Sequence, residues 1–217
     1  MGRSCTLPRS SISPFAPAVA GPVHELDRDH LEHRGGHLPQ PLRHPSAGLV
    51  SKPPGLGQPG LRVHRIAADH IIPSFYTEHT YFFATTHIAN RGQKQGEFIS
   101  PLHTALAKGI KFVNHTDFNV APIDQLFVLW TSVNRVSREG QVIDAAERIS
   151  PLEGLKALTI NTAYLYREEK TKGSLEAGKL ADLVILDKNP LTVDPMTIKD
   201  IKVLETIKEG KTVYAAK

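Results

Sequence analysis

Hydrophobic and polar positions follow a regular pattern only from about residue 71 onward. Residues 71–76 form a short apolar run, typical of a strand that is buried on both faces. Ser100 and Pro101 then provide an N-cap and a first-turn proline for a helix that Gly109 ends. A second apolar run follows at 110–113. Strand, helix and strand in this order predict one right-handed parallel unit.

A second helix is predicted further along the chain. Ser150, Pro151 and Glu153 form a capping box with proline at the first helical position. Apolar positions at helical spacing continue the pattern, so a helix is expected over 151–166.

Residues 171–217 are expected to form a separate antiparallel tail. A turn at 177–179 precedes an apolar run at 180–186, which indicates a strand. Alternating residues at 201–207 and a glycine turn leading into 211–214 predict a β-hairpin.

Residues 1–70 differ from the rest in composition. They are rich in proline, arginine and histidine, contain a single aromatic residue, Phe15, and show no sustained period of 3.6 or 2. Such a segment has too little apolar surface to offset the entropy of ordering itself, so a disordered arm is expected. The change in composition also raises the hypothesis that this arm is an out-of-frame translation, which the upstream reading frames would test.

Charge and composition exclude several classes of protein. The net charge is +4, but no cluster of lysine and arginine with interleaved aromatic residues indicates a nucleic-acid groove. No apolar stretch reaches the ~20 residues of a membrane-spanning helix. The single cysteine, Cys5, excludes an internal disulfide framework and fits a cytoplasmic location.

Polar side chains follow both predicted strands of the parallel unit. His79 lies just after the first strand, and the sequence His115-Thr116-Asp117 follows the second. In parallel α/β folds the carboxyl ends of strands open onto the active-site face, where an imidazole and a carboxylate can coordinate a divalent cation. The alternative is that Asp117 caps a turn and His79 is an ordinary residue of the rim.

A second histidine cluster lies in the arm, at His30, His33 and His37. Its spacing would place imidazoles on one helix face suited to zinc. Gly35-Gly36 disfavours that helix, so these histidines are interpreted as incidental.

Several motifs in residues 71–217 resemble one enzyme family. The segments "IIPSFYTEHTYFF", "ISPLHTALAKGIKF", "NHTDFNVAP" and "GSLEAGKLADLVILDKNPL" are similar to the amidohydrolase superfamily, in particular its amidohydrolase family 3 branch. The resemblance implies an α/β fold in which 71–170 supply the last strands and helices of a TIM-type (β/α)8 barrel. It also implies that 171–217 supply the C-terminal strands of a small β-sandwich.

The resemblance also implies roles for particular residues. Asp117 would be the metal-linked carboxylate and general base, and His79 a ligand of a divalent metal, with zinc as the expected ion. His115 would bind substrate or shape the pocket, and His87 is a candidate at the rim with less support. The implied substrate is a small molecule with an amide or imide bond outside peptides.

The sequence departs from the family pattern in ways that leave the activity open. The His-x-His pair of the first strand, the bridging residue of a middle strand and the histidine of the fifth strand are missing from this sequence. The chain is therefore interpreted as a truncated, impaired hydrolase, as one part of a site that another chain completes, or as a non-enzymatic structural or interaction protein. Uncovered barrel edges would favour self-association.

Overall fold

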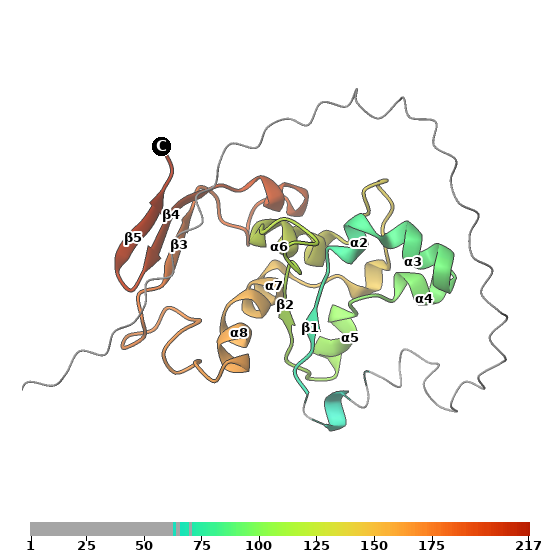
Figure 1. The fold of residues 1–217 in the computed structure, drawn as a ribbon, viewed down its shortest axis with the longest axis horizontal. Helices are drawn as coiled ribbons and strands as arrows, with labels where there is room; N and C mark the ends of the chain where they lie inside the picture. Colours follow the sequence, from blue (N-terminus) through green and yellow to red (C-terminus); the bar gives the residue numbers. More distant parts are fainter. Residues whose placement is uncertain (1–62, 64–65, 70) are drawn as a thin grey trace, which may run out of the picture. The chain divides into compact units, whose positions relative to one another are not determined.

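The structure is a computed structural model that describes residues 63, 66–69 and 71–217. Every described residue belongs to one compact unit (Figure 1). The expected arm therefore lies outside the described residues, except for 63 and 66–69. The histidine cluster at His30, His33 and His37 lies outside them as well.

Two short parallel strands confirm the predicted parallel unit. β1 (Ser74–Phe75) pairs with β2 (Val113–Asn114), and α5 (Leu102–Ala107) lies between them in sequence. Both strands are shorter than the apolar runs that predicted them. Among the described residues β1 and β2 pair only with each other, so a closed barrel is not seen in this part of the chain.

The start of α5 corrects the expected cap. Ser100 has a positive φ of 46°, and its hydroxyl donates to the Tyr76 carbonyl oxygen at 3.0 Å. Pro101 is the N-cap residue and makes no side-chain cap bond. The expected stop is confirmed, because the helix ends before Gly109, which has a φ of 67°. Ser100 thus links the α5 entry to the end of β1.

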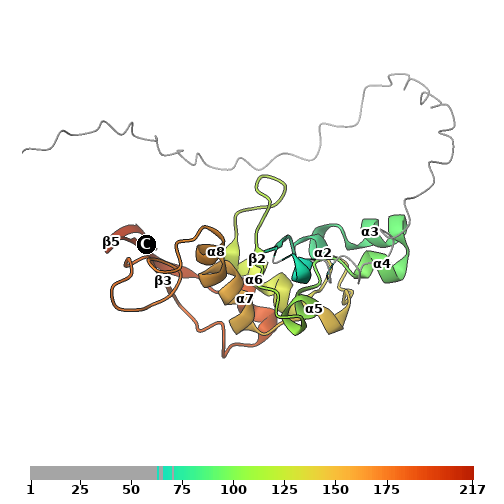
Figure 2. The same ribbon diagram turned by 90° about the horizontal axis from the view of Figure 1, so that it is seen from below.

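Three helices that were not expected from the pattern follow β1. They are α2 (His79–Phe82), α3 (Ala84–Arg91) and α4 (Gln93–Glu97). Helices α3 and α4 lie side by side (Figure 2). Gly96 allows this approach, because a Cβ at that position would lie 2.5 Å from the Ile88 Cα.

The described residues form two hydrophobic clusters, and one of them is built around α6 (Gln125–Asn134). Asp124 caps this helix, and its Oδ1 accepts the backbone N–H groups of Leu126 and Phe127 at 3.0 Å each. α6 packs against the 3₁₀ helix η2 (Pro195–Asp200), where the indole of Trp130 donates to the Met196 carbonyl at 3.0 Å.

Arg135 closes the C-terminal end of α6 as a buried charge. Its guanidinium donates to four backbone carbonyls, at distances of 2.7 to 3.2 Å; they belong to Ile143, Ser100, Glu97 and Ile99. Burial lowers the pKa of Arg135 to about 10, so the side chain stays charged at neutral pH. This one residue links α6 to the segment that precedes α5.

The predicted helix over 151–166 is two helices. α7 (Pro151–Leu158) follows the 3₁₀ helix η1 (Ala145–Glu147), and α8 (Ile160–Leu165) follows a break at Thr159. The Ser150 cap is confirmed, since its hydroxyl accepts the Glu153 N–H at 3.3 Å. Thr159 has a φ of −123° and a ψ of −92°, which interrupts the helix.

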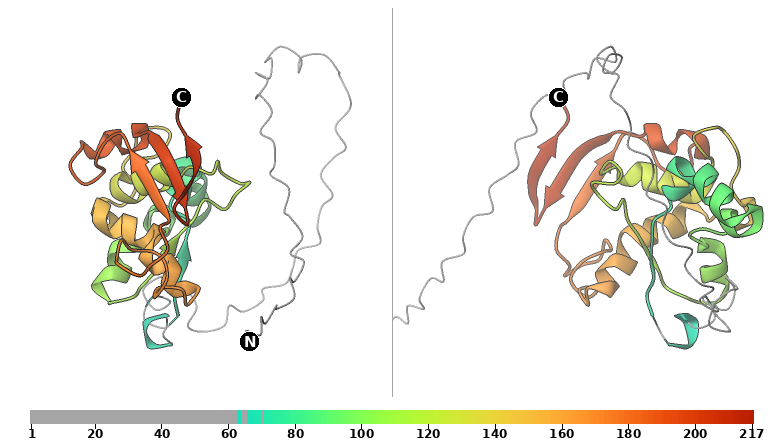
Figure 3. Two further views of the ribbon diagram at one scale, coloured as in Figure 1. Left: turned by 90° about the vertical axis from the view of Figure 1, so that its left-hand side faces the viewer. Right: turned by 45° about the vertical axis from the view of Figure 1, so that its right-hand side comes forward.

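The antiparallel tail is confirmed as a three-stranded sheet in the order β3 (Leu183–Leu186), β4 (Val203–Lys208) and β5 (Lys211–Ala215) (Figure 3). A turn at Glu209 and Gly210 joins the last two strands, as expected. Among the described residues this sheet has no second sheet packed on it, so the expected β-sandwich stays a prediction.

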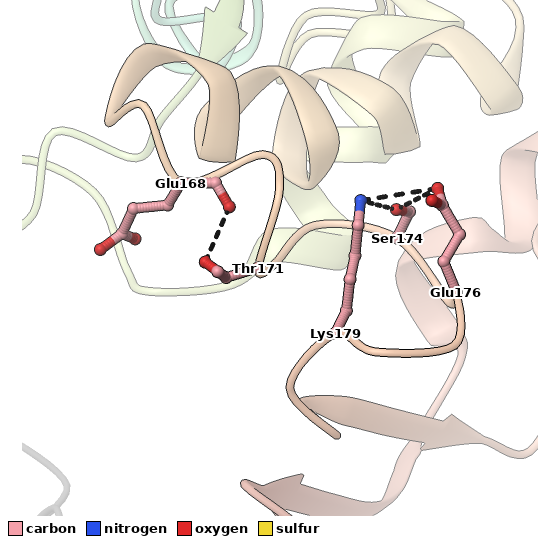
Figure 4. Close-up of polar contacts among 5 residues, drawn as sticks. All are labelled: Glu168, Thr171, Ser174, Glu176 and Lys179. Atoms are coloured by element: carbon pink, nitrogen blue, oxygen red, sulfur yellow. Dashed lines mark hydrogen bonds and ion pairs between the residues drawn. The ribbon is translucent and has the colours of Figure 1, made fainter.

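Surface contacts hold the connection between α8 and β3. The Lys179 ammonium donates to the Ser174 hydroxyl and lies 3.5 Å from a carboxylate oxygen of Glu176, while Thr171 donates to the Glu168 carbonyl at 3.1 Å (Figure 4). The contacts of the Lys179 ammonium, together with the Lys179 N–H that donates to the Glu176 carbonyl at 3.2 Å, hold the expected turn at 177–179. Among the described residues, no helix is long and apolar enough to cross a membrane.

Candidate functional site

The two parallel strands bring the candidate residues to one edge. His79 follows the carboxyl end of β1 by four residues, and His115 is the first residue after β2, with Asp117 two residues later. The Phe75 carbonyl accepts the His115 N–H at 3.0 Å, which extends the parallel pairing as far as the site. Both polar segments therefore leave the sheet at the same end, as the sequence predicts.

The aromatic ring of Tyr76 lies between the two candidate histidines. It meets the His79 ring edge-on at a centroid distance of 4.2 Å and stacks on the His115 ring at 5.7 Å. Ser74 also restrains the His115 ring, because the Ser74 hydroxyl lies 2.8 Å from Nδ1 of His115. Tyr76 is the residue that places His79 and His115 in one cluster.

The phenol of Tyr76 is buried and has no hydrogen-bond partner among the described residues. Burial raises its pKa to about 12, with smaller contributions from the carboxylates of Glu78 and Asp117. The hydroxyl is therefore protonated at neutral pH.

Three neighbours restrain the His79 ring. Besides Tyr76, the Phe83 ring meets it edge-on at 5.5 Å, and Nε2 of His87 lies 3.2 Å from its Nδ1. Burial and the neighbouring His87 lower the pKa of His79, while Asp117 opposes the shift. The imidazole is neutral at pH 7, which is the form that can bind a metal ion.

Asp117 is exposed and has a positive φ of 52°, a conformation that Asp tolerates better than most residues. Its carbonyl accepts the Val120 N–H at 2.7 Å, so the carboxylate sits on a tight turn. Its negative charge raises the pKa of Tyr76 and opposes the lowering of the pKa of His79.

A buried polar network lies directly beneath the site. The Asn114 side-chain amide donates to Thr77 Oγ1 at 2.8 Å and to Ser132 Oγ at 2.9 Å. Thr77 Oγ1 lies 2.8 Å from Thr131 Oγ1 on α6. The network joins the ends of both strands to α6, so helix α2, which begins at His79, and the loop that carries Asp117 start from fixed positions.

Glu78 is the least satisfied polar group in this region. Its side chain is fully buried, and neither carboxylate oxygen has a hydrogen-bond partner among the described residues. Burial, followed by repulsion from Asp124, raises its pKa to about 7. An unpaired buried carboxylate is costly, and it favours protonation.

The side chains present fit a zinc site in kind but not in number. Imidazole and carboxylate are suitable ligands, but a catalytic zinc usually has three protein ligands and an open position. Among residues 63, 66–69 and 71–217, no group of three histidine, cysteine or acidic side chains is arranged to hold a metal ion. The metal role of His79 and Asp117 therefore stays a prediction.

The sequence did not indicate several residues that the structure brings to the site. Thr77 and Asn114 each follow directly after an apolar run, and their burial together depends on α6. The pairing of His87 with His79 needs a change in helix direction that no sequence period shows. In the sequence, the one feature that pointed to Glu78 as a site residue was its position next to the candidate metal ligand His79.

A family model described as "Amidohydrolase family" matches residues 41–214. The match begins inside the segment expected to be an arm, and it extends through the strand-end residues to the last strand of the tail.

Two curated proteins share moderate identity with parts of this chain. N-substituted formamide deformylase of Arthrobacter pascens is 28% identical over 125 residues, which are 57% of this chain and 23% of that protein. The putative amidohydrolase YtcJ of Bacillus subtilis is 27% identical over 114 residues, 51% of this chain and 22% of that protein. The chain thus spans about a quarter of the length of these curated relatives.

Two solved structures are similar to this chain over part of their length. A structure described as an uncharacterized metal-dependent hydrolase from Pyrococcus furiosus aligns with a TM-score of 0.50 and 26% identity, covering 60% of this chain and 26% of that one. An adenosine deaminase from Xanthomonas campestris with bound zinc aligns with a TM-score of 0.52 over 72% of this chain and 35% of that one, and at 18% identity it supports the fold alone. The parallel strand pair, the motifs and the extent of the family match agree, and this chain belongs to the amidohydrolase family.

Proposed function

We propose that this chain carries part of a hydrolase site that acts on carbon–nitrogen bonds outside peptides. The observation that supports it is the contact of Tyr76 with His79 and His115 at the carboxyl ends of two paired parallel strands, with Asp117 two residues after His115 in the chain. N-substituted formamides are the first substrates to test, because one relative of this chain is named for that activity.

Each residue of the cluster has a distinct role in this proposal. Asp117 is exposed and accepts a proton from the attacking water, which is general-base catalysis. His79, neutral and restrained, is a ligand for a divalent cation. His115, held by Ser74 and Tyr76, lies where it can contact substrate.

A divalent cation, zinc by the donor types present, would supply the Lewis acidity that polarises a carbonyl and activates water. With only two candidate ligands in this cluster, we expect the isolated chain to bind zinc weakly and to hydrolyse substrate slowly. Further ligands would come from outside the described residues or from a second copy that associates through the strand edges.

Zinc binding and hydrolysis by the purified chain test the proposal. We expect bound zinc to fall in His79→Gln and Asp117→Asn, and formamide hydrolysis to fall by about 10²-fold or more in Asp117→Asn. His103→Gln is the matched control, because His103 is an exposed histidine on α5. Unchanged zinc binding in both site variants would contradict the proposal.

The alternative is a non-enzymatic structural or interaction protein that keeps the family fold. It is favoured by the absence of a three-ligand group among the described residues. No hydrolysis of formamides, amides or imides at saturating zinc, together with no binding of zinc, would support this alternative.

A further inference from the structure

The contact between His79 and His87 depends on a break in the helix. In one straight α-helix, residues eight positions apart lie about 12 Å from each other along the axis. Here the ring centroids of His79 and His87 are 4.9 Å apart, because α2 ends and α3 begins around Phe83, which has a φ of −128° and a ψ of 9°. The local chain direction thus brings the two imidazoles together.

The bond between the rings uses one particular nitrogen of His79. Nδ1 of His79 lies 3.2 Å from Nε2 of His87, a distance suited to a single N–H···N hydrogen bond. Since Nδ1 is engaged, Nε2 is the nitrogen of His79 that remains to bind a ligand. Tyr76 and Phe83 contact the same ring edge-on, so its orientation is fixed from three directions.

The direction of this hydrogen bond decides whether His79 can act as a ligand. A neutral imidazole carries one proton, and the nitrogen without it is the one that can bind a metal ion. If Nδ1 donates to His87, the lone pair lies on Nε2. If His87 donates instead, Nε2 carries the proton and the lone pair is used in the bond between the rings.

We infer that His87 is a positioning residue for His79: its Nε2 accepts the Nδ1–H of His79 and holds that ring in the tautomer whose Nε2 lone pair is free. The inference rests on the proposed function for its purpose, since a metal-binding histidine commonly donates its other N–H to an acceptor. The tautomer itself can be measured with no metal and no substrate.

Nitrogen NMR of the full chain labelled with ¹⁵N-histidine tests the inference. At about pH 8, well above the ~6.5 of an ordinary histidine, two-bond ¹⁵N–¹H correlations report which nitrogen of each ring is protonated. His79→Gln assigns the His79 signals. We expect wild-type His79 to be protonated at Nδ1.

Two substitutions separate positioning from packing. His87→Phe keeps a ring but removes the acceptor, and we expect the ratio of the Nδ1–H to the Nε2–H tautomer of His79 to fall about fivefold, the loss of one ordinary hydrogen bond. His87→Gln keeps an acceptor oxygen at similar reach and should restore the wild-type ratio. His103→Gln, at an exposed position, should change nothing.

The outcomes are distinct from those of the hydrolase proposal. A wild-type His79 protonated at Nε2 overturns the inference, and this result needs no variant to fold. An unchanged ratio in a folded His87→Phe chain overturns it as well. If the Nδ1–H tautomer is found but neither zinc binding nor hydrolysis is detected, the positioning role stands and the proposed function fails.

Discussion

The strand-end region, residues 74–135, and the tail, residues 171–217, use polar side chains in opposite ways. In the strand-end region hydroxyls, an amide and a guanidinium are buried and bonded to backbone or to each other, as for Thr77, Asn114 and Arg135. In the tail, the pairs of Lys199 with Asp200 and of Lys208 with Glu209 are exposed, the pair of Lys179 with Glu176 keeps an exposed carboxylate, and every residue of β5 is exposed.

This difference separates two ways of holding a structure. A buried hydrogen bond is strengthened by its low-dielectric surroundings, and loss of one partner leaves the other unsatisfied. An exposed pair exchanges its partner for water at little cost. The strand-end region should therefore respond strongly to single polar substitutions, and the tail should hardly respond.

Arg135 should give the largest effect in the strand-end region. Arg135→Met removes the donor from four backbone carbonyls, so we expect the free energy of unfolding to fall by about 3–5 kcal/mol in urea titrations. Arg138→Met is the control: Arg138 is exposed and lies 5.5 Å from the Phe82 ring, and its loss should cost less than about 1 kcal/mol. Equal losses in the two variants would refute the contrast.

Replacing the Glu78 carboxylate should raise the free energy of unfolding, in contrast to Arg135→Met, and the gain should depend on pH. Its pKa is raised from 4.5 to about 7 in the folded chain, so the folded state holds the proton more tightly. The stability that this provides is present below about pH 4.5 and is lost as pH rises to about 7.

Glu78→Gln should therefore be more stable than wild type by about 3 kcal/mol at pH 8, and the gain should shrink toward pH 4.5. The measurement is the difference in unfolding free energy between variant and wild type across this pH range, with Glu139→Gln at an exposed position as control. A flat difference would show that Glu78 is charged or paired in solution.

Gly96 tests the packing behind the histidine pair. Alanine favours a helix by about 1 kcal/mol over glycine, but its Cβ would lie 2.5 Å from the Ile88 Cα, a backbone atom that cannot turn aside. We expect Gly96→Ala to lower the free energy of unfolding, measured by urea titration, by about 1–2 kcal/mol. A stabilised Gly96→Ala chain would mean that α3 and α4 lie further apart.

Lys179 should give the smallest effect that can be measured. Its ammonium contacts Ser174 and Glu176 at the turn before β3, with 10% of its side chain exposed (Figure 4). Lys179→Met should cost about 0.5–1 kcal/mol by urea titration, and the cost should shrink in high salt. Lys172→Met, which breaks a more exposed pair with Glu168, should have no detectable effect.

The sequence predicted correctly those elements whose signals come from residues close together in the chain. The Ser150 cap and the final hairpin depend on residues close together in the chain, and the structure confirms both. The parallel pairing of β1 with β2 joins residues 39 positions apart, but it was predicted from the order of a strand, a helix and a strand, each with a local pattern, and it is confirmed as well. The Ser100 cap was wrong because the hydroxyl bonds to Tyr76, 24 residues away. No local rule includes such a partner.

Helix interruptions and buried polar contacts were not predictable in the same way. The apolar run of α6 is buried on most sides, so it lacks the one-sided pattern that marks an amphipathic helix. Thr159 interrupts the helix expected over 151–166, and Phe83 separates α2 from α3. The second break creates the pairing of His79 and His87, which no spacing rule for a straight helix would include.

The amide of Asn114 has a consequence for the alignment of the site. A ladder of only two residue pairs, Ser74 with Val113 and Phe75 with Asn114, does little by itself to prevent one strand from slipping along the other. The bonds from Asn114 to Thr77 and Ser132 are made in one alignment only, so a slip would leave a buried amide unsatisfied. A side chain without chemistry of its own thereby sets the spacing between His79 and Asp117.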